Sequence, residues 1–420
     1  QRQMCIRDRG VLIGLIIAIV LIIRKVSPVY SLILGSLIGG LIGGFPLSDT
    51  VSIMIDGVKD VTPAILRILS AGVLSGVLVK TGAAVSISNT IIHKLGQRHV
   101  FMALALATML LTTIGVFIDV AVITVAPIAL SLGQKLSIPK STLLLVMIGG
   151  GKSGNIISPN PNTIIAAENF RADLSSVMFA NLLPAVIGLL FTVYIVVRFL
   201  PSKGELSTEI NTESEQKDLP SFATSMVAPI VAISLLSFRP LFGFIIDPLI
   251  ALPIGGLSGI LVMRKWRTLK ESLSYGLDKM SIVAILLIGT GTLAGIIKAS
   301  SIKDLLLDVL SHVPFGDIFI APLSGVLMSA ATASTTAGAT VASASFSETI
   351  LAAGISSVWG AAMINAGATV LDHLPHGSFF HTTGGVTHVN ISDRLKLIPY
   401  ETAIGVILTI SSVILCLLIG

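Results

Sequence analysis

The residues best suited to chemistry lie together in one short segment, 149–163, which reads GGGKSGNIISPNPNT. Its glycines and prolines do not continue an α-helix, yet apolar residues flank the segment on both sides. Lys152 is a fixed cation that suits a carboxylate, and asparagine amides can both donate to hydroxyl groups and accept from them. The segment therefore predicts a break in a membrane helix where a small hydroxylated anion binds. The predicted substrate-binding residues of this segment are Lys152, Ser153, Asn155, Asn160, Asn162 and Thr163.

Two other interpretations of this glycine-rich segment have less support. The Gly-Lys-Ser triplet resembles a phosphate-binding loop, but the earlier glycine that the motif requires falls on Val146. An ordinary exposed loop would also tolerate these residues, although loops rarely need so much backbone freedom beside so many amides.

A second candidate is the acidic residue Asp119, which interrupts the apolar run 100–132. A carboxylate inside a membrane is costly unless it is paired, protonated or hydrated, so Asp119 is a predicted proton or substrate site. A hairpin tip at the membrane surface is the alternative. The matching run of the second half holds small hydroxyl residues at 332–340, where Ser334 and Thr335 could cap half-helices and donate to an anion. Tight helix packing explains these small residues equally well.

The segment LDHLPHGSFFHT, residues 371–382, follows the second interrupted run as the glycine-rich segment follows the first. It holds three of the seven histidines, and imidazole titrates near neutral pH, so Asp372 and His376 are predicted to couple proton movement. Ser378 joins the predicted substrate-binding residues. A zinc site made of Asp372, His376 and His381 is an alternative, but the spacing matches no known metal motif. A surface loop is the other alternative.

The composition restricts the class of protein that can hold these segments. Of the 420 residues, 53% are hydrophobic and only 12% are charged, against roughly 25% charged residues in soluble domains. So few charges cannot cover a soluble surface, which excludes a soluble enzyme and a disordered chain. The two cysteines, Cys5 and Cys416, lie at opposite ends, so a disulfide framework is not expected. The net charge of +5 comes from short basic clusters between apolar runs, which indicates membrane topology rather than nucleic-acid binding.

Apolar stretches recur along the chain and predict an all-α polytopic membrane protein with about 12 membrane segments. The run 100–132 would be about 50 Å long as one helix, too long for a single pass. It must be a re-entrant hairpin or two segments, with Gly115, Asp119 and Pro127 as candidate break points. The apolar stretches are 11–23, 28–45, 61–79, 100–132, 142–150, 175–200, 222–246, 248–263, 280–297, 318–334, 339–370 and 397–418.

The chain divides near its middle at residues 201–220, a polar linker with almost no large apolar side chains. This division predicts a first transmembrane repeat over 11–200 and a second over 221–420. Residues 1–10 are expected to be a polar N-terminal tail, which could be an artefact of sequence assembly. A shift of 219 residues aligns Gly57, Gly72, Leu74, Gly76 and His93 with Gly276, Gly291, Leu293, Gly295 and His312.

Basic residues indicate that the two repeats have opposite orientations in the membrane. In the first half, Arg24 and Lys25 follow the opening helix, and the loop after the second helix has no Lys or Arg. In the second half the basic cluster instead follows the second helix, at 264–270. By the positive-inside rule the repeats are inverted and the linker is cytoplasmic, unless the charges are scattered by chance. Inverted repeats with broken helices or re-entrant hairpins are typical of secondary transporters.

Three features together resemble the gluconate permease (GntP-type) family of the ion-transporter superfamily: GGGKSGNIISPNPNTIIAAENF, the acidic break at Asp119, and LDHLPHGSFFHTTGG. The resemblance covers most of the chain. It implies a multi-pass protein of the bacterial inner membrane that imports sugar acids or small hydroxy-monocarboxylates, usually with protons. It also implies re-entrant hairpins and elevator-like movement in a homodimer. The end of the asparagine-rich loop and the stretch HTTGGVTHVNISDRLKLIPYE depart from the gluconate pattern, so gluconate itself is not fixed as the substrate.

The leading hypothesis is therefore a secondary active transporter, not an enzyme, that imports a small organic anion such as gluconate with H⁺ and uses no cofactor. Lys152 would neutralise the substrate carboxylate with help from half-helix N-termini. A Na⁺-coupled carboxylate symporter or a cation antiporter is the alternative, because helix-end carbonyls and Asn oxygens also suit Na⁺. An intramembrane hydrolase is a remote alternative, since neither HExxH nor GxSxG occurs.

Overall fold

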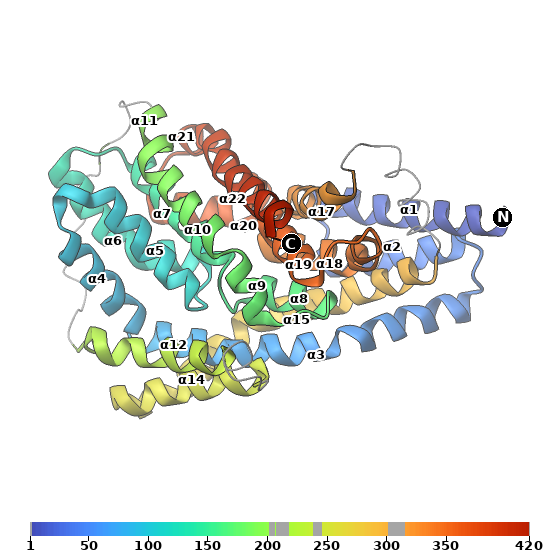
Figure 1. The fold of residues 1–420 in the computed structure, drawn as a ribbon, viewed down its shortest axis with the longest axis horizontal. Helices are drawn as coiled ribbons and strands as arrows, with labels where there is room; N and C mark the ends of the chain where they lie inside the picture. Colours follow the sequence, from blue (N-terminus) through green and yellow to red (C-terminus); the bar gives the residue numbers. More distant parts are fainter. Residues whose placement is uncertain (1, 201–205, 207–217, 238–245, 301–315, 420) are drawn as a thin grey trace.

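The computed structural model describes residues 2–200, 206, 218–237, 246–300 and 316–419 (Figure 1). Within these ranges the regular elements are helices, and the only β pairing is an isolated bridge between Pro139 and Leu206. The prediction of an all-α protein is confirmed. Most of the polar linker and most of the amphipathic stretch near residue 300 lie outside the described residues.

The helices of the first half range in length from the 34 residues of α3 to the three of α11. They are α1 (Arg2–Ile23), α2 (Pro28–Ile42), α3 (Leu47–Lys80), α4 (Ala83–Leu95), α5 (Val100–Thr113), α6 (Ile118–Leu136), α7 (Lys140–Asn155), α8 (Pro161–Asn169), α9 (Leu174–Ala180), α10 (Leu182–Phe191) and α11 (Val197–Phe199), with a 3₁₀ turn at Gln97–His99 and a π-helical turn at Thr192–Val196. Residues 2–10, expected to be a tail, are therefore helical.

The helices of the second half are likewise a mixture of long and short elements. They are α12 (Phe222–Leu236), α14 (Pro248–Met263), α15 (Leu269–Lys298), α17 (Gly316–Thr332), α18 (Thr335–Ala352), α19 (Ser357–Gly367), α20 (Ser378–Val386), α21 (Ile391–Lys396) and α22 (Ile398–Ile419), with a 3₁₀ turn at Trp266–Thr268.

Five helical segments of the described chain are long and apolar enough to cross a membrane. A sixth is added if α4 and the segment Gln97–Thr113, bent by 101° from each other, count as one broken span. Shorter apolar helices, such as α2 and α14, accompany them. The protein is thus a multi-pass membrane protein with many broken elements. The five segments are Leu47–Lys80, Ile118–Leu136, Leu174–Phe199, Trp266–Lys298 and Ile391–Ile419.

The long helices α3 and α15 lie side by side along the length of the molecule, with α1 and α2 near one end and α12 and α14 near the other (Figure 1). Glycines let the two backbones touch. A Cβ atom on Gly57 would lie 2.1 Å from the carbonyl oxygen of Gly291, and one on Gly276 would lie 2.1 Å from that of Gly72. No side chain fits at these crossings, so glycine is required there.

The remaining helices pack beside this pair, and several of them are interrupted. The apolar run 100–132 breaks between α5 and α6 at Gly115, whose φ of +100° suits glycine and disfavours other residues. The predicted break at Gly115 is confirmed, whereas Pro127 lies inside α6 and Asp119 lies in its first turn. The run 339–370 likewise divides into α18 and α19. The turn Ala333–Ser334 separates α17 from α18.

Candidate functional site

Lys152 lies near the end of α7 and is completely buried. Its Nζ is 2.7 Å from Asp372 Oδ1 and 2.9 Å from His373 Nδ1, and it donates to the carbonyl oxygen of Thr369 at 2.6 Å. An ammonium group has three N–H donors, and here each has an acceptor, while the carbonyl oxygen of Glu401 lies farther away at 3.5 Å. A buried charge is tolerated only with such partners, so this contact fixes α7 to the segment between α19 and α20.

Asp372 connects the same cluster to the start of α18. Its second oxygen, Oδ2, accepts a hydrogen bond from Thr335 Oγ1 at 2.5 Å. Ser334 caps this helix, because its side chain accepts from the backbone N–H of Ala337 at 3.3 Å. Three residues singled out in distant parts of the sequence, Lys152, Thr335 and Asp372, therefore meet at one place.

Three buried residues of the site were missed in the sequence. His373 lies beside Asp372 with its Nδ1 3.1 Å from Asp372 Oδ1, and its Nε2 is 3.1 Å from the carbonyl oxygen of Ile398. Glu401 lies on α22 with Oε2 3.9 Å from His373 Nδ1. Arg394 pairs with both carboxylate oxygens of Glu401, and both side chains are at most 1% exposed. The one sequence signal for Arg394 and Glu401 was their opposite charge at a spacing of seven residues, about two helical turns, at the edge of the apolar run 397–418.

A second group of polar side chains, which we call the amide cluster, lies on the other side of the first turn of α18. It consists of Asn162, Thr163, Thr336 and Asn365. Asn162 Nδ2 donates to Asn365 Oδ1 at 2.9 Å, and Asn365 Nδ2 donates to Thr163 Oγ1 at 3.0 Å. Thr336 Oγ1 is 3.4 Å from Asn162 Oδ1. Asn365 was not identified in the sequence, because it lies in a run of small apolar residues. These donors and acceptors join α8, α18 and α19 at one point.

The glycines of the segment 149–163 were expected to break the helix, but α7 continues through them to Asn155, and the other asparagines of the segment hold the break that follows it. Asn160 caps α8, since its Oδ1 accepts from the backbone N–H of Thr163 at 3.1 Å. Its amide nitrogen donates to Asn155 Oδ1 at 2.6 Å and to the Asn155 carbonyl oxygen at 2.8 Å. Ser153 Oγ donates to the Gly149 carbonyl oxygen at 2.9 Å, within its own helix. Asn155 and Asn160 thus position the residues around them.

Several predicted residues lie outside this cluster. Asp119 Oδ1 accepts from the backbone N–H of Val120 at 2.9 Å, at the start of α6. His376 Nε2 is 3.3 Å from the carbonyl oxygen of Ala331, and Ser378 is exposed. Across the part of the chain that the structure describes, no three His, Cys, Asp or Glu residues are grouped so that they could hold a metal ion.

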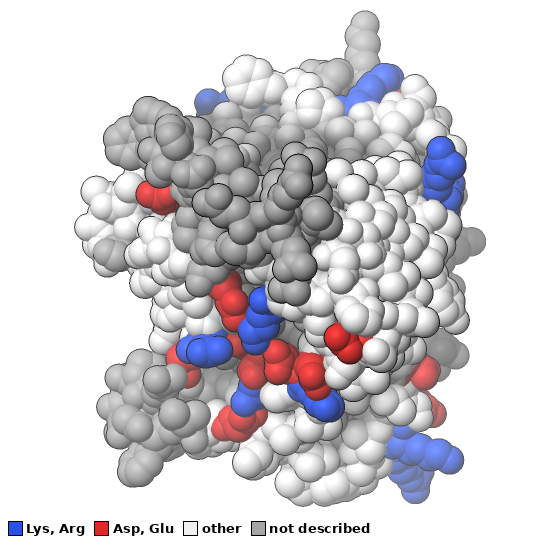
Figure 2. All heavy atoms as spheres, turned by 90° about the vertical axis from the view of Figure 1, so that its right-hand side faces the viewer, with Lys and Arg blue, Asp and Glu red and all other residues white. Residues whose placement is uncertain are grey.

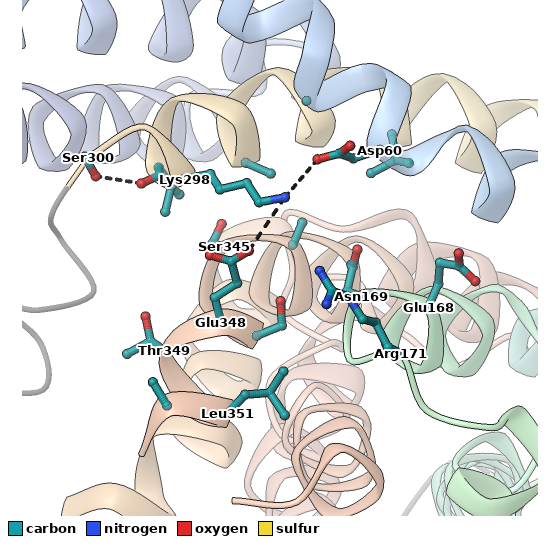
Figure 3. Close-up of a pocket in the computed structure, with 17 residues that line it drawn as sticks. Asp60, Glu168, Asn169, Arg171, Lys298, Ser300, Ser345, Glu348, Thr349 and Leu351 are labelled. Atoms are coloured by element: carbon teal, nitrogen blue, oxygen red, sulfur yellow. Dashed lines mark hydrogen bonds and ion pairs between the residues drawn. The ribbon is translucent and has the colours of Figure 1, made fainter. Parts of the chain in front are cut away.

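A cavity of about 700 Å³ lies between the pair α3 and α15 on one side and α8 and α18 on the other (Figure 3). Lys298 of α15 reaches across its wall, with Nζ 3.0 Å from Asp60 of α3 and 3.6 Å from Glu348 of α18. Arg171 also lines it. Figure 2 shows acidic and basic side chains gathered below the middle of the face at the right of Figure 1, among described residues that are mostly uncharged.

A smaller cavity of about 260 Å³ has Arg67 of α3 in its wall. Arg67 pairs with Glu168 of α8 and with Asp247, whose Oδ2 is 2.7 Å from its Nη2. The hydrogen bond from Arg67 lowers the pKa of Asp247 below its ordinary value. The long helices are thus linked by ion pairs to the helices that carry the amide cluster.

The sequence profile of the GntP family permeases matches residues 9–420. An "uncharacterized transporter" of Haemophilus influenzae is 55% identical over 406 residues, which cover 97% of each chain. The gluconate permease of Pseudomonas aeruginosa is 24% identical over 237 residues, 54% of this chain and 52% of its own. The solved YdaH transporter of Alcanivorax borkumensis has a similar fold, with a TM-score of 0.59, 13% identity and 89% of each chain covered.

Proposed function

We propose that this chain, which belongs to the GntP family of permeases and is a membrane transporter rather than an enzyme, imports a small hydroxylated organic anion together with a proton. The observation that carries the proposal is the buried contact between Lys152 and Asp372, which joins helix breaks from the two halves of the chain. Transporters bind ligands where broken helices leave backbone groups facing the protein interior. A titratable buried ion pair at such a place is a functional site by default.

The substrate class follows from the groups around the first turns of α8 and α18. Asn162, Thr163, Thr336 and Asn365 offer both donors and acceptors to hydroxyl groups. The N-termini of the two helices favour a carboxylate, because unpaired backbone N–H groups carry partial positive charge there. Gluconate, another sugar acid or a shorter hydroxy-monocarboxylate combines both features. The name of the Pseudomonas relative supports the same class.

An arrangement as two inverted repeats, 11–200 and 221–420, is supported by the contacts between α3 and α15. A pseudo-two-fold axis requires that every contact between the repeats occur twice. Under the shift of 219 residues, the contact of Gly57 with Gly291 becomes the contact of Gly276 with Gly72, and both are present. Two further contacts obey the same shift, namely Gly76 with Ser272 and Gly295 with Ile53.

The orientation of the larger cavity follows if basic residues mark the cytoplasmic side. Helix α15 then starts on the cytoplasmic side, next to the cluster 264–270, and ends at Lys298 on the opposite side. The cavity beside Lys298 therefore opens to the outside of a bacterial inner membrane. In this interpretation the structure is open toward the side from which substrate is imported.

Proton coupling is preferred to Na⁺ coupling because of what surrounds Asp372. Its Oδ1 already faces the ammonium of Lys152, and its Oδ2 accepts from Thr335. A bound Na⁺ would need several oxygen ligands, and here a fixed cation occupies that position. The pair of Asp372 and its neighbouring imidazole, in contrast, can gain a proton without further space.

The test is uptake of labelled gluconate, glycerate and lactate into liposomes that contain the purified protein. An inside-alkaline pH gradient is expected to drive accumulation of at least one acid, and replacing external Na⁺ by choline is expected to leave the rate unchanged. Asp372→Asn is expected to abolish accumulation. Lys396→Ala is the matched control, because Lys396 forms an exposed ion pair with Asp393 away from the site. Uptake of none of the acids would refute the proposal, and uptake that requires Na⁺ would refute its proton coupling.

A further inference from the structure

Five titratable side chains form one buried group, which we call the charge cluster: Lys152, Asp372, His373, Arg394 and Glu401. All five are at most 2% exposed. Two are cations and two are carboxylates, so their charges cancel when the imidazole is neutral. An unbalanced charge is costly in such an environment, and the protonation of His373 therefore decides the net charge of the whole cluster.

The hydrogen-bond partners of His373 place a hydrogen on Nε2 and leave Nδ1 facing one donor and one acceptor. Nε2 is 3.1 Å from the carbonyl oxygen of Ile398, which can only accept, so Nε2 carries the hydrogen. Nδ1 is 2.9 Å from Lys152 Nζ, which can only donate, and 3.1 Å from Asp372 Oδ1, which can only accept, so Nδ1 accepts from Lys152 when the imidazole is neutral. The neutral imidazole thus receives one of the three hydrogen bonds of the Lys152 ammonium.

A proton has one place to bind on this imidazole, and it changes the cluster in two ways. On Nδ1 it would point at Asp372 Oδ1, 3.1 Å away, with Glu401 Oε2 at 3.9 Å. The net charge of the cluster rises from zero to +1. Because Nδ1 can then no longer accept, the N–H of Lys152 that bonded to it has only the long contact with the carbonyl oxygen of Glu401, at 3.5 Å, within reach.

The charged groups that face His373 come from each element around it. They are Lys152 of α7, Asp372 of its own segment and Glu401 of α22, while Arg394 of α21 acts through Glu401. The two carboxylates attract a positive charge on the imidazole, and the ammonium of Lys152 opposes it. A carboxylate from outside the cluster would remove this opposition by pairing with Lys152.

The first turn of α18 connects the charge cluster to the amide cluster. Thr335 bonds to Asp372 in the former, and the next residue, Thr336, contacts Asn162 in the latter. A change at Asp372 or Lys152 is therefore one residue away from the groups proposed to bind the substrate hydroxyls.

From these contacts we infer that His373 is the proton-binding residue and that its protonation frees one donor of Lys152 for the carboxylate of a monovalent substrate. This inference rests on the proposed function. One proton and one monovalent anion then restore a neutral cluster, so each strengthens the binding of the other. Import of a monovalent hydroxy acid moves no net charge, and a dicarboxylate is a poor substrate because its second charge has no counterion.

The experiment measures the dissociation constant of gluconate, or of the best hydroxy acid from the uptake screen, at several pH values with purified protein. In the wild type, affinity is expected to fall by up to about tenfold for each pH unit above the protonation range of the imidazole, as linkage requires for one coupled proton. His373→Gln is expected to make the affinity independent of pH. His376→Gln is the matched control and is expected to keep the wild-type pH dependence.

A second measurement does not depend on how well a variant folds. In a weakly buffered solution at pH 8, the wild type is expected to take up one proton for each anion bound, as followed with a pH-sensitive dye. Binding without proton uptake, or a His373→Gln protein whose affinity still depends on pH, overturns the inference and leaves the proposed function standing. If no hydroxy acid binds to or enters liposomes with the wild type, the proposed function fails and this inference fails with it.

Discussion

Lys152 Nζ and Asp372 Oδ1 lie 2.7 Å apart in the interior of the protein, although 220 positions separate the two residues in the chain. The pair joins helix α7 of the first half to the segment between α19 and α20 of the second half. Sequence reasoning gave the two residues separate tasks, substrate binding for Lys152 and proton coupling for Asp372. Their direct contact makes the two tasks parts of one site.

Removing one member of this pair is expected to leave the other as an uncompensated buried charge. Asp372→Asn should destabilise the protein by about 3–5 kcal/mol, the cost typical of breaking a buried ion pair. Replacing both residues, Lys152→Met with Asp372→Leu, should recover much of this loss but not transport. Thermal unfolding in detergent, together with uptake assays, separates the two effects. A double variant as unstable as Asp372→Asn alone would contradict the argument.

Arg394 and Glu401 form the second ion pair of the charge cluster, and the Arg394 guanidinium also lies 4.6 Å from the centre of the Phe380 ring. Glu401→Gln keeps the shape of the side chain but removes its charge, so Arg394 is left buried and unpaired. We expect a clearly lower melting temperature. Asp56→Asn is the control, because its ion pair with Lys59 is exposed and screened by solvent, so its loss should change the melting temperature little. Equal melting temperatures for the two variants would contradict the role given to Glu401.

The glycine contacts between α3 and α15 make a prediction about symmetry. Gly57→Ala and Gly276→Ala each place a methyl group 2.1 Å from a backbone oxygen of the facing helix, so both should destabilise the protein by at least about 1–3 kcal/mol. Gly385→Ala is the control, because a Cβ there meets no atom within 4 Å. Melting temperatures measure all three. A strong effect at Gly57 with none at Gly276 would weaken the case for related repeats.

Asp247 predicts a dependence of stability on pH. Its hydrogen bond from Arg67 lowers its pKa in the folded protein, so the ionised carboxylate stabilises the fold above the unfolded value of about 3.9 and loses this effect as the pH falls through the folded value. Asp247→Asn keeps a side chain able to cap α14 but removes the charge. Its melting temperature should be slightly below the wild-type value at pH 6 and should approach it toward pH 3, because this side chain is partly exposed. A difference that grows toward acid would contradict the assignment.

The sequence alone predicted the helical class and the break at Gly115. It also identified Lys152, Thr335 and Asp372, which meet in the interior. It did not predict which segments meet, because no local pattern shows that Lys152 contacts a residue 220 positions later. His373 was missed because His376, three residues later, carries the same titratable side chain, and the sequence does not show which of the two lies beside Lys152. Arg394 and Glu401 were missed because charges at the edge of an apolar run are usually solvated, and here packing buries them completely.

The most direct test of the account is accumulation of labelled gluconate, or the best hydroxy acid of the screen, in liposomes with a pH gradient as the only driving force. The account predicts that nigericin, which dissipates the pH gradient in the presence of K⁺, abolishes accumulation. It also predicts that setting the membrane potential with valinomycin and K⁺ leaves the accumulation unchanged, because a proton and a monovalent anion enter together. Accumulation that survives nigericin, or that follows the membrane potential, would contradict it.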